Sequence, residues 1–296
     1  MAGPDEMRTF CAVAESGSFS AAARRLQVTR SAVSKSIQKL EDTLQARLFH
    51  RTTRRISLTE AGEVYLQHAR LALHAVDAAA DAVASLTREP QGRIRATAPM
   101  SFGLTRLSDI IGDFLQQYPG LSIELCLDDG LIDLVGGGFD IAVRIGNLPD
   151  SGMVARRIGE MPAVLVASPD YVAERGRPAT PDELPAHDCL LYAFRPGSHE
   201  WQFTRDGRAQ SVRVSARYEV NSSIALRKAV LAGNGISRIP EYLVADDIET
   251  GRLVQLLSDY RMDNAPIQAV FPERGLIPRK TRLFADFLEA ALADGR

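Results

Sequence analysis

The N-terminal part of the chain alternates short apolar patterns of helical spacing with polar breaks. Apolar side chains recur every three or four residues over 7–14, and small or apolar side chains do so over 21–27. A third pattern places four apolar side chains on one helical face: Val33, Ile37, Leu40 and Leu44. Such spacing is typical of amphipathic helices. We predict three short helices, the second capped by Ser20 and the third by Thr29, whose hydroxyls can accept from free backbone N–H groups.

Strand-like alternation follows the third helix. Leu48 and Phe49, then Ile56 and Leu58, flank a polar, basic tip, which predicts a short hairpin or wing. Thr59 next caps a helix that we expect to continue to about residue 88. Six of its apolar residues have the spacing of a two-helix seam: Leu66, Ala69, Leu73, Val76, Ala80 and Val83. The seam implies a partner helix, which a second copy of the chain would supply in a homodimer. A packed helix of the same chain is the alternative.

The remaining two hundred residues alternate predicted strands and helices after a break at Glu89–Gly92, where we expect a hinge. This order favours a largely parallel sheet covered on both faces. The strands are expected near 93–98, 121–127, 140–144, 162–167, 190–193, 201–204, 212–218, 235–239 and 266–271. The main helices are expected after Ser101, Ser168, Asn221-Ser222 and Pro278.

The net charge of -2 over 296 residues conceals a strong asymmetry. Residues 91–296 hold 23 basic and 27 acidic side chains. Residues 24–55 hold only two acidic side chains, Glu41 and Asp42, against nine basic ones. The nine are Arg24, Arg25, Arg30, Lys35, Lys39, Arg47, Arg51, Arg54 and Arg55. A basic block on a slightly acidic body suggests a module that binds a polyanion, although a solvated charged face is the alternative.

Two helices joined by a tight turn, the second basic on its outer face, describe a helix-turn-helix, whose second helix fits the DNA major groove. A helical bundle with a solvated face is the alternative. Arg30 could pair with guanine, and Lys35 and Lys39 suit phosphates. The wing could follow the phosphate backbone or enter the minor groove. The predicted DNA-binding residues are Ser20, Thr29, Arg30, Ser31, Ser34, Lys35, Lys39, Arg51, Thr53, Arg54 and Arg55.

Residues 5–88 resemble the N-terminal signature of LysR-type transcriptional regulators. Two positions depart from the family pattern: Gln45 stands where glycine is frequent, and Arg30 where glutamine is common. The second departure leaves the base preference open. The resemblance is carried by Phe19-Ser20-x-Ala22-Ala23-x-x-Leu26, by Ser31-Ala32-Val33-Ser34-x-x-Ile37-x-x-Leu40-Glu41, by Leu48-Phe49-x-Arg51 and by Leu58-Thr59-x-Ala61-Gly62.

The resemblance implies an α/β protein with an N-terminal winged helix-turn-helix and a C-terminal effector domain of the type 2 periplasmic-binding-protein kind. The effector domain would have two subdomains joined by crossovers near 161–163 and 265–268. We expect a DNA-binding domain at 1–59, a linker and dimerisation helix at 60–89, and the effector domain at 90–296. Its subdomain 1 would take 90–162 and 267–296, and its subdomain 2 would take 163–266.

The implied function is sequence-specific regulation of transcription, controlled by a small molecule bound between the subdomains. Free N–H groups at three predicted helix N-termini favour anions, and Arg144 could add a bidentate contact to a carboxylate. A small or aromatic carboxylate is therefore the expected effector, although each of these residues could be an ordinary cap or an ion-pair partner. The expected effector-binding residues are Ser101, Phe102, Arg144, Ser168, Asn221 and Ser222.

Other classes of function have less support in the sequence. No HExxH, GxSxG or CxxC motif occurs, and Ser36-x-x-Lys39 lies on the predicted recognition helix, so we expect no catalytic residue, metal or cofactor. Cys126 and Cys189 would fall in different subdomains, which disfavours a thiol switch. A cytosolic solute-binding protein without DNA function is the alternative. The first ten residues lack an apolar signal region, so we expect a cytoplasmic protein without a membrane partner. The expected partners are double-stranded DNA, further copies of the chain up to a tetramer, and RNA polymerase.

Overall fold

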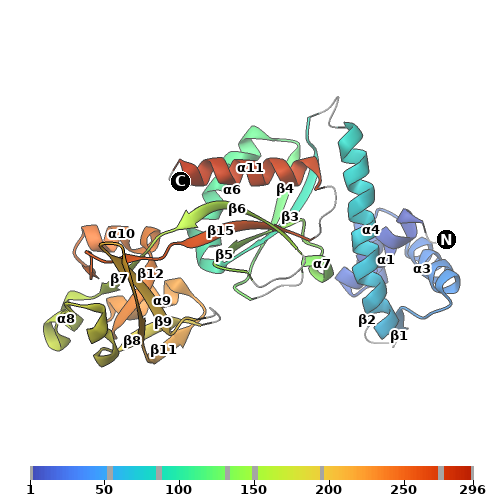
Figure 1. Cartoon of the computed structure of the whole chain (residues 1–296). Coiled ribbons are helices and arrows are strands. Elements are labelled where there is room, and N and C mark those ends of the chain that lie inside the picture. The colour runs from blue at the N-terminus through green and yellow to red at the C-terminus, as the bar shows by residue number, and fades with distance from the viewer. Residues whose placement is uncertain are drawn as a thin grey trace.

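The computed structural model describes residues 3–51, 56–84, 89–130, 134–148, 153–193, 197–272 and 277–294. An N-terminal helical domain, one long linker helix and a C-terminal α/β domain follow one another along the chain (Figure 1). The N-terminal domain consists of α1 (Pro4–Ser16), α2 (Phe19–Arg25), α3 (Arg30–Leu44), β1 (Phe49–Arg51) and β2 (Ile56–Leu58). The linker helix is α4 (Glu60–Ala84).

The N-terminal domain has its own hydrophobic core, built by one face of each of its helices. Phe10 of α1, Val33 and Ile37 of α3 and Phe49 of β1 are almost fully buried in it. Thr29 caps α3 as predicted, because its hydroxyl accepts from the N–H of Ala32 at 3.2 Å. The expected cap on α2 was wrong by two residues. Ser18 accepts from the N–H of Ala21, whereas Ser20 lies inside the helix.

The C-terminal domain contains two five-stranded mixed sheets. Subdomain 1 has the strand order β4-β3-β5-β15-β6, and subdomain 2 has the order β11-β8-β12-β7-β13. The strands of subdomain 1 are β3 (Gly92–Ala98), β4 (Leu121–Leu127), β5 (Ile141–Ile145), β6 (Val154–Met161) and β15 (Ala265–Phe271). Those of subdomain 2 are β7 (Ala163–Ala167), β8 (Cys189–Tyr192), β11 (Ala216–Val220), β12 (Ile236–Pro240) and β13 (Val254–Leu256).

The expectation of a largely parallel sheet was only half right. β3, β4 and β5 are parallel, but β15 is antiparallel to both β5 and β6. The reason is the double crossover between the subdomains. The chain leaves subdomain 1 at the end of β6 and returns at the start of β15, so these two strands run in opposite directions. A small antiparallel sheet, β10-β9-β14, adds β9 (Glu200–Arg205), β10 (Arg208–Arg213) and β14 (Arg261–Met262).

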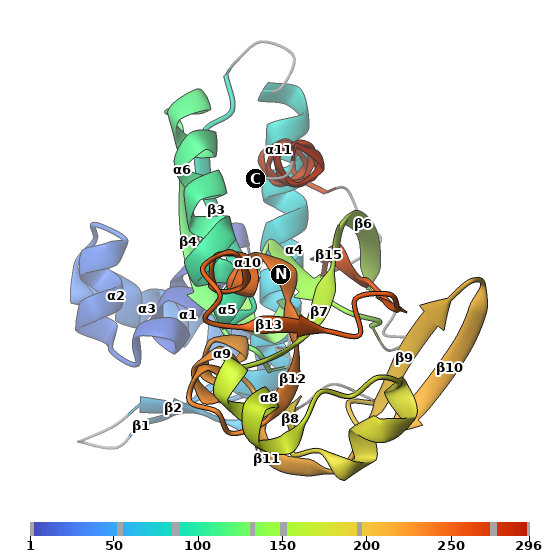
Figure 2. The same cartoon turned by 90° about the vertical axis from the view of Figure 1, so that its left-hand side faces the viewer.

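Helices cover the two large sheets (Figures 1 and 2). In subdomain 1, the ring of Phe114 packs against that of Phe284 at 5.0 Å between centroids, which joins two helices over one face of the sheet. The helices of subdomain 1 are α5 (Met100–Phe102), a π-helical turn (Gly103–Leu107), α6 (Ser108–Gln117), α7 (Leu134–Gly137) and α11 (Arg279–Ala293). Those of subdomain 2 are α8 (Pro169–Arg175), a 3-10 helix (Pro181–Ala186), α9 (Ser223–Leu231) and α10 (Glu241–Glu249). Within the described ranges, no helix is long and apolar enough to cross a membrane.

Candidate functional site

Helix α3 presents the polar face that was predicted to read DNA. Val33, Ile37 and Leu40 are buried, which turns the opposite side of the helix outward. Arg30 occupies the first turn of α3, and the residues of its outer face are at the surface. Thr29, Arg30, Ser31, Lys35 and Lys39 are exposed, and Ser34 is half-buried. This geometry leaves the N-terminal turns of α3 free to enter a groove of DNA.

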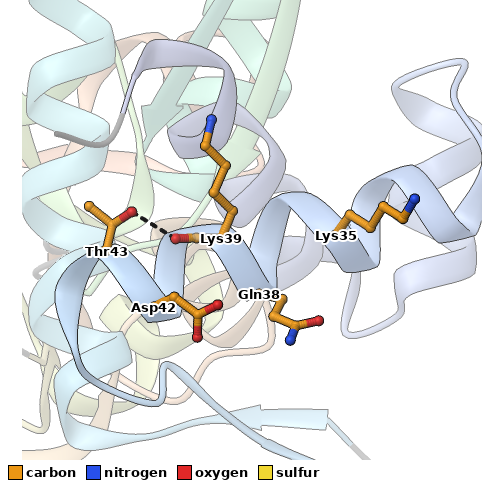
Figure 3. A pocket seen from close by; sticks show the side chains of 5 residues that line it. All are labelled: Lys35, Gln38, Lys39, Asp42 and Thr43. Atoms are coloured by element: carbon orange, nitrogen blue, oxygen red, sulfur yellow. Dashed lines mark hydrogen bonds between the residues drawn. The ribbon is translucent and has the colours of Figure 1, made fainter.

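A shallow hollow follows the later turns of α3, lined by Lys35, Gln38, Lys39, Asp42 and Thr43 (Figure 3). The Nζ of Lys39 lies 2.6 Å from the carboxylate of Glu6 in α1, and this pairing raises the pKa of Lys39. Lys35 has no ion pair of this kind among the described residues. Of the two lysines predicted to contact phosphates, Lys35 can therefore do so without breaking an ion pair. Lys39 would first have to give up its ion pair with Glu6.

The wing begins with a buried carboxylate to which the sequence alone assigned no structural role. Glu41 is 3% exposed, and its Oε1 accepts from the backbone N–H of Leu48 at 2.9 Å and of Phe49 at 3.3 Å. β1 then pairs with β2 in an antiparallel hairpin, as predicted. The predicted DNA contacts Thr53, Arg54 and Arg55, and the side chain of Arg51, lie outside the described residues.

The linker helix uses part of its predicted seam within the chain. Ala69 is 1% exposed, and Leu66 and Leu73 pack against the core of the N-terminal domain. The intrachain alternative therefore accounts for this half of the seam. The opposite face of α4 carries Val64, which is 54% exposed, and seven residues later Leu71, which is half-buried. Residues seven apart share a helix face, so α4 has a second apolar stripe that faces away from the N-terminal domain.

Strand direction decides which candidate effector residues can meet. The ends of β6 and β7 at Met161 and Ala163 mark the crossover. β5 runs antiparallel to β15 and ends toward the crossover, as do β3 and β4, which places Ser101 and Arg144 at that end. In subdomain 2, Asn221 and Ser222 follow β11 at the corresponding end. The structure therefore brings these residues to the facing ends of the two sheets.

Two of the expected helix N-termini need correction. Ser168 caps α8 by accepting from the N–H of Tyr171, but it follows the end of β7 that points away from the crossover. It cannot share a site with Ser101. Ser101 itself is not a cap, because its helix starts at Met100 and no side-chain cap is present there. Ser222 does cap α9, where its hydroxyl accepts from the N–H of Ala225 at 3.3 Å.

Ser101 and Arg144 share an unusual property. Ser101 is 6% exposed, and neither its Oγ nor the Nη2 of Arg144 has a hydrogen-bond partner among the described residues, although both atoms are buried. Burial lowers the pKa of Arg144, and the carboxylates of Asp128 and Asp129 oppose that shift. Buried polar atoms without partners cost free energy, so an incoming acceptor would relieve that cost.

Aromatic side chains link the two subdomains beside these residues. The ring of Phe102 meets that of Tyr242 edge to face at 6.4 Å, and the guanidinium of Arg106 lies over the Tyr242 ring at 5.5 Å. Burial and then the Asp129 carboxylate raise the pKa of Tyr192. Of these aromatic residues, the sequence pattern indicated Phe102 but neither Tyr192 nor Tyr242. Their positions next to strand ends, at the end of β8 and the start of α10, were the available signal.

The cysteines give no support to a thiol switch. Burial raises the pKa of Cys11 to about 11 and that of Cys189 to about 12, so both remain protonated thiols at neutral pH. Cys126 is exposed at the surface of β4 in subdomain 1, whereas Cys189 lies in subdomain 2. The described ranges contain no cluster of three or more His, Cys, Asp or Glu side chains suited to a metal ion.

Known proteins resemble the chain in both parts. A family model for a bacterial regulatory helix-turn-helix protein of the lysR family matches residues 4–63, and one for the LysR substrate binding domain matches residues 87–293. An HTH-type transcriptional regulator of Xanthomonas campestris pv. campestris is 36% identical over 96% of this chain and 83% of its own. The HTH-type transcriptional activator AaeR of Escherichia coli K12 is 34% identical over 95% of this chain and 91% of its own.

The solved structures agree with the sequence relatives. CrgA, a LysR-type transcriptional regulator from Neisseria meningitidis, superimposes with a TM-score of 0.60 at 35% identity, over 97% of this chain and 98% of its own. The fold class predicted from the sequence, a winged helix-turn-helix joined to a two-subdomain α/β effector domain, is thus confirmed. With family matches over both domains and relatives above 30% identity along nearly the whole chain, the chain belongs to the LysR family of bacterial transcriptional regulators.

Proposed function

We propose that this LysR-type regulator reads its operator with α3 and the wing and answers to a small carboxylate held between the two subdomains. The DNA-binding part is supported by the exposed polar face of α3 and by the basic block that includes Arg30 and Lys35. Long-range attraction to phosphates would supply most of the affinity for DNA. Contacts of Arg30 with base edges would supply sequence specificity.

The single observation that supports a carboxylate effector is the pair of buried atoms without partners, Oγ of Ser101 and Nη2 of Arg144. A hydroxyl that follows β3 and a guanidinium near the end of the neighbouring parallel strand β5 offer donors to one carboxylate. The edge-to-face pair of Phe102 and Tyr242 supplies apolar surface next to these donors, which favours an aromatic acid over an aliphatic one. Asn221 and Ser222 would close the site from subdomain 2.

Thermal unfolding of the full chain with benzoate and with succinate tests this proposal. Benzoate should raise the Tm of the wild type, since a ligand at one hundred times its Kd stabilises the native state by about 2.7 kcal/mol. Arg144→Gln should abolish the rise. Arg156→Gln is the matched control, because Arg156 lies in the same sheet but pairs with Asp286 and Glu289 of α11. Absence of a rise with both acids, or a rise that survives Arg144→Gln, would contradict the proposed site.

We also propose that the chain works in the cytoplasm as a homodimer through α4, and that dimers combine into a tetramer that can contact RNA polymerase. The support for the dimer is the second apolar stripe of α4, which contains Val64 and Leu71. The rival reading as a solute-binding protein without DNA function is disfavoured, because it leaves the helix-turn-helix match over residues 4–63 unexplained. The named relatives are transcriptional regulators, so no catalytic residue is proposed.

A further inference from the structure

One carboxylate of the N-terminal domain is shared by arginines from three other elements. Glu15 near the end of α1 lies 2.7 Å from Arg25 of α2, 3.1 Å from Arg70 of α4 and 3.8 Å from Arg95 of β3. The first two arginines belong to the N-terminal domain and the linker helix. Arg95 belongs to the effector domain, so this carboxylate joins all three parts of the chain. We call these four residues the Glu15 cluster.

The surroundings of Arg95 hold its guanidinium in place. Its Nη1 donates to the carbonyl oxygens of Gly137 and Gly138 at 3.0 and 3.3 Å, and its Nε donates to Glu124 at 3.1 Å. The group also lies 5.4 Å from the centre of the Phe139 ring. An arginine restrained from several sides presents its charge toward Glu15 at little further cost in side-chain entropy.

The run Gly136-Gly137-Gly138 at the end of α7 has a role at this contact. A Cβ added to Gly138 would lie 2.9 Å from Nη1 of Arg95 and 3.1 Å from Nε of Arg70. Its φ of +66° also suits glycine. The bare backbone lets one arginine from the linker helix and one from the effector domain approach it together. Figure 1 shows α7, just before this glycine, next to α4.

The Glu15 cluster is partly buried, and one of its hydrogen-bond donors is unsatisfied. The Arg70 side chain is 14% exposed, and its Nε has no hydrogen-bond partner among the described residues. Burial alone would raise the pKa of Glu15, but Arg25 and Arg70 lower it overall, so the carboxylate is charged at neutral pH. An ion cluster with an unsatisfied donor stabilises only modestly, which suits a contact that must open.

The strands connect this contact to the proposed ligand site. Arg95 lies in β3, which continues into Ser101, and its backbone N–H donates to Asp140 at 2.7 Å, directly before the strand that carries Arg144. The two ends of the same parallel strands thus face the N-terminal domain and subdomain 2. A shift of Ser101 and Arg144 against each other would move Arg95 relative to Glu15.

We propose that the Glu15 cluster docks the effector domain onto the DNA-binding domain, and that its opening transmits the ligand signal to α3. The second half of this statement rests on the function proposed above. The docked state then restrains the angle between the recognition helix and the effector domain. In the open state this ionic link between the two domains is absent.

Amide hydrogen exchange of the full chain, without DNA or ligand, tests the docking. Glu15→Gln changes only the N-terminal domain, yet it should speed exchange in the 134–139 segment of the effector domain about two- to fivefold. Arg95→Gln changes only the effector domain, yet it should speed amide exchange in α4 around Arg70. Glu6→Gln is the matched control, since Glu6 shares α1 with Glu15 but pairs with Lys39 inside the N-terminal domain. No change in the opposite domain with either variant would overturn the docking.

DNA binding tests the signalling half. Arg93→Gln and Arg95→Gln remove the same charge from the same strand, and both arginines pair with Glu124, but of the two only Arg95 pairs with Glu15. We expect the Kd for a duplex of the DNA upstream of the gene to differ at least about threefold between the two variants. Equal Kd values would overturn the signalling role. If the wild type does not bind DNA at all, the proposed function is refuted, but the docking measured by hydrogen exchange is not.

Discussion

The carboxylate of Glu41 lies buried against the start of the wing, where its Oε1 accepts from the backbone N–H of Leu48 at 2.9 Å. Its other oxygen accepts from Arg47 at 2.8 Å. Glu41 belongs to α3 and Leu48 precedes β1, so this bond joins the recognition helix to the wing. The relative position of α3 and the wing, the two elements proposed to read DNA, therefore depends on one buried side chain.

Replacing this carboxylate should destabilise the N-terminal domain. Glu41→Ala leaves the N–H groups of Leu48 and Phe49 buried without an acceptor, and we expect a loss of about 3 kcal/mol in the free energy of unfolding. Glu41→Gln keeps one carbonyl oxygen as an acceptor and should lose less. Urea denaturation followed by circular dichroism measures both losses. Equal stability of the alanine variant and the wild type would show that the bonds are not needed.

The end of α3 offers a stabilising change. Gln45 has a φ of +51°, the left-handed region in which a residue with a Cβ is strained. Gln45→Gly should relieve this strain and raise the free energy of unfolding by about 1 kcal/mol. The Gln45 amide donates to the carbonyl of Asp42 at 2.7 Å, and losing that exposed bond offsets a small part of the gain. Gly17→Ala at the end of α1, where φ is +59°, is the opposite test and should destabilise.

The sequence predicted those features that depend on neighbouring residues along the chain. Thr29 and Ser222 act as helix caps where the sequence analysis placed them, because a cap bonds to backbone only two or three residues ahead. The packing face of α4 could not be predicted in this way. Leu66 and Val64 lie on opposite faces, both apolar, and only the position of the N-terminal domain decides which face is covered.

The candidate effector site also depends on long-range packing that the sequence pattern does not predict. The fold and Arg144 at a strand end were within reach of pattern analysis, but the direction of β7 was not. Ser168 lies at the wrong end of its sheet because β7 starts at the crossover and runs away from it. Ser101 was named for a capping role that it lacks, and it remains in the proposed site for its buried hydroxyl instead. Strand direction comes from long-range pairing, which local spacing does not encode.

Substitutions on α3 should separate specificity from affinity. Arg30→Ala removes a side chain that we propose pairs with a base edge, so it should relax sequence preference at one position by about 1–3 kcal/mol. Lys35→Ala removes a proposed phosphate contact and should weaken binding to all duplexes alike, with the salt slope reduced by about one. Competition assays with single-base operator variants at several salt concentrations measure both. Identical behaviour of the two variants would refute this division of roles.

The outward stripe of α4 should control dimer formation. Val64→Glu places a charge on the exposed apolar face and should shift the chain toward monomers, because an interface of this kind cannot bury an unpaired carboxylate cheaply. Gln38→Glu adds the same charge at an exposed position of α3, away from α4, and serves as the control. Sedimentation velocity across a range of protein concentrations measures the shift. Dimers that survive Val64→Glu unchanged would place the interface elsewhere.

The ionisation of Glu15 predicts how acid affects the contact between domains. Its pKa is lowered in the folded chain: burial works against ionisation, but Arg25 and Arg70 outweigh it. A carboxylate with a depressed pKa contributes stability that is present above its unfolded value of about 4.3 and is lost as pH falls through the folded value. The wild type should therefore lose stability more steeply below about pH 4 than Glu15→Gln, which has no proton to bind there. Chemical denaturation at a series of pH values compares the two slopes. Parallel curves would mean that Glu15 has the same pKa in the folded and unfolded chain, and hence that its three arginines do not stabilise the charged form.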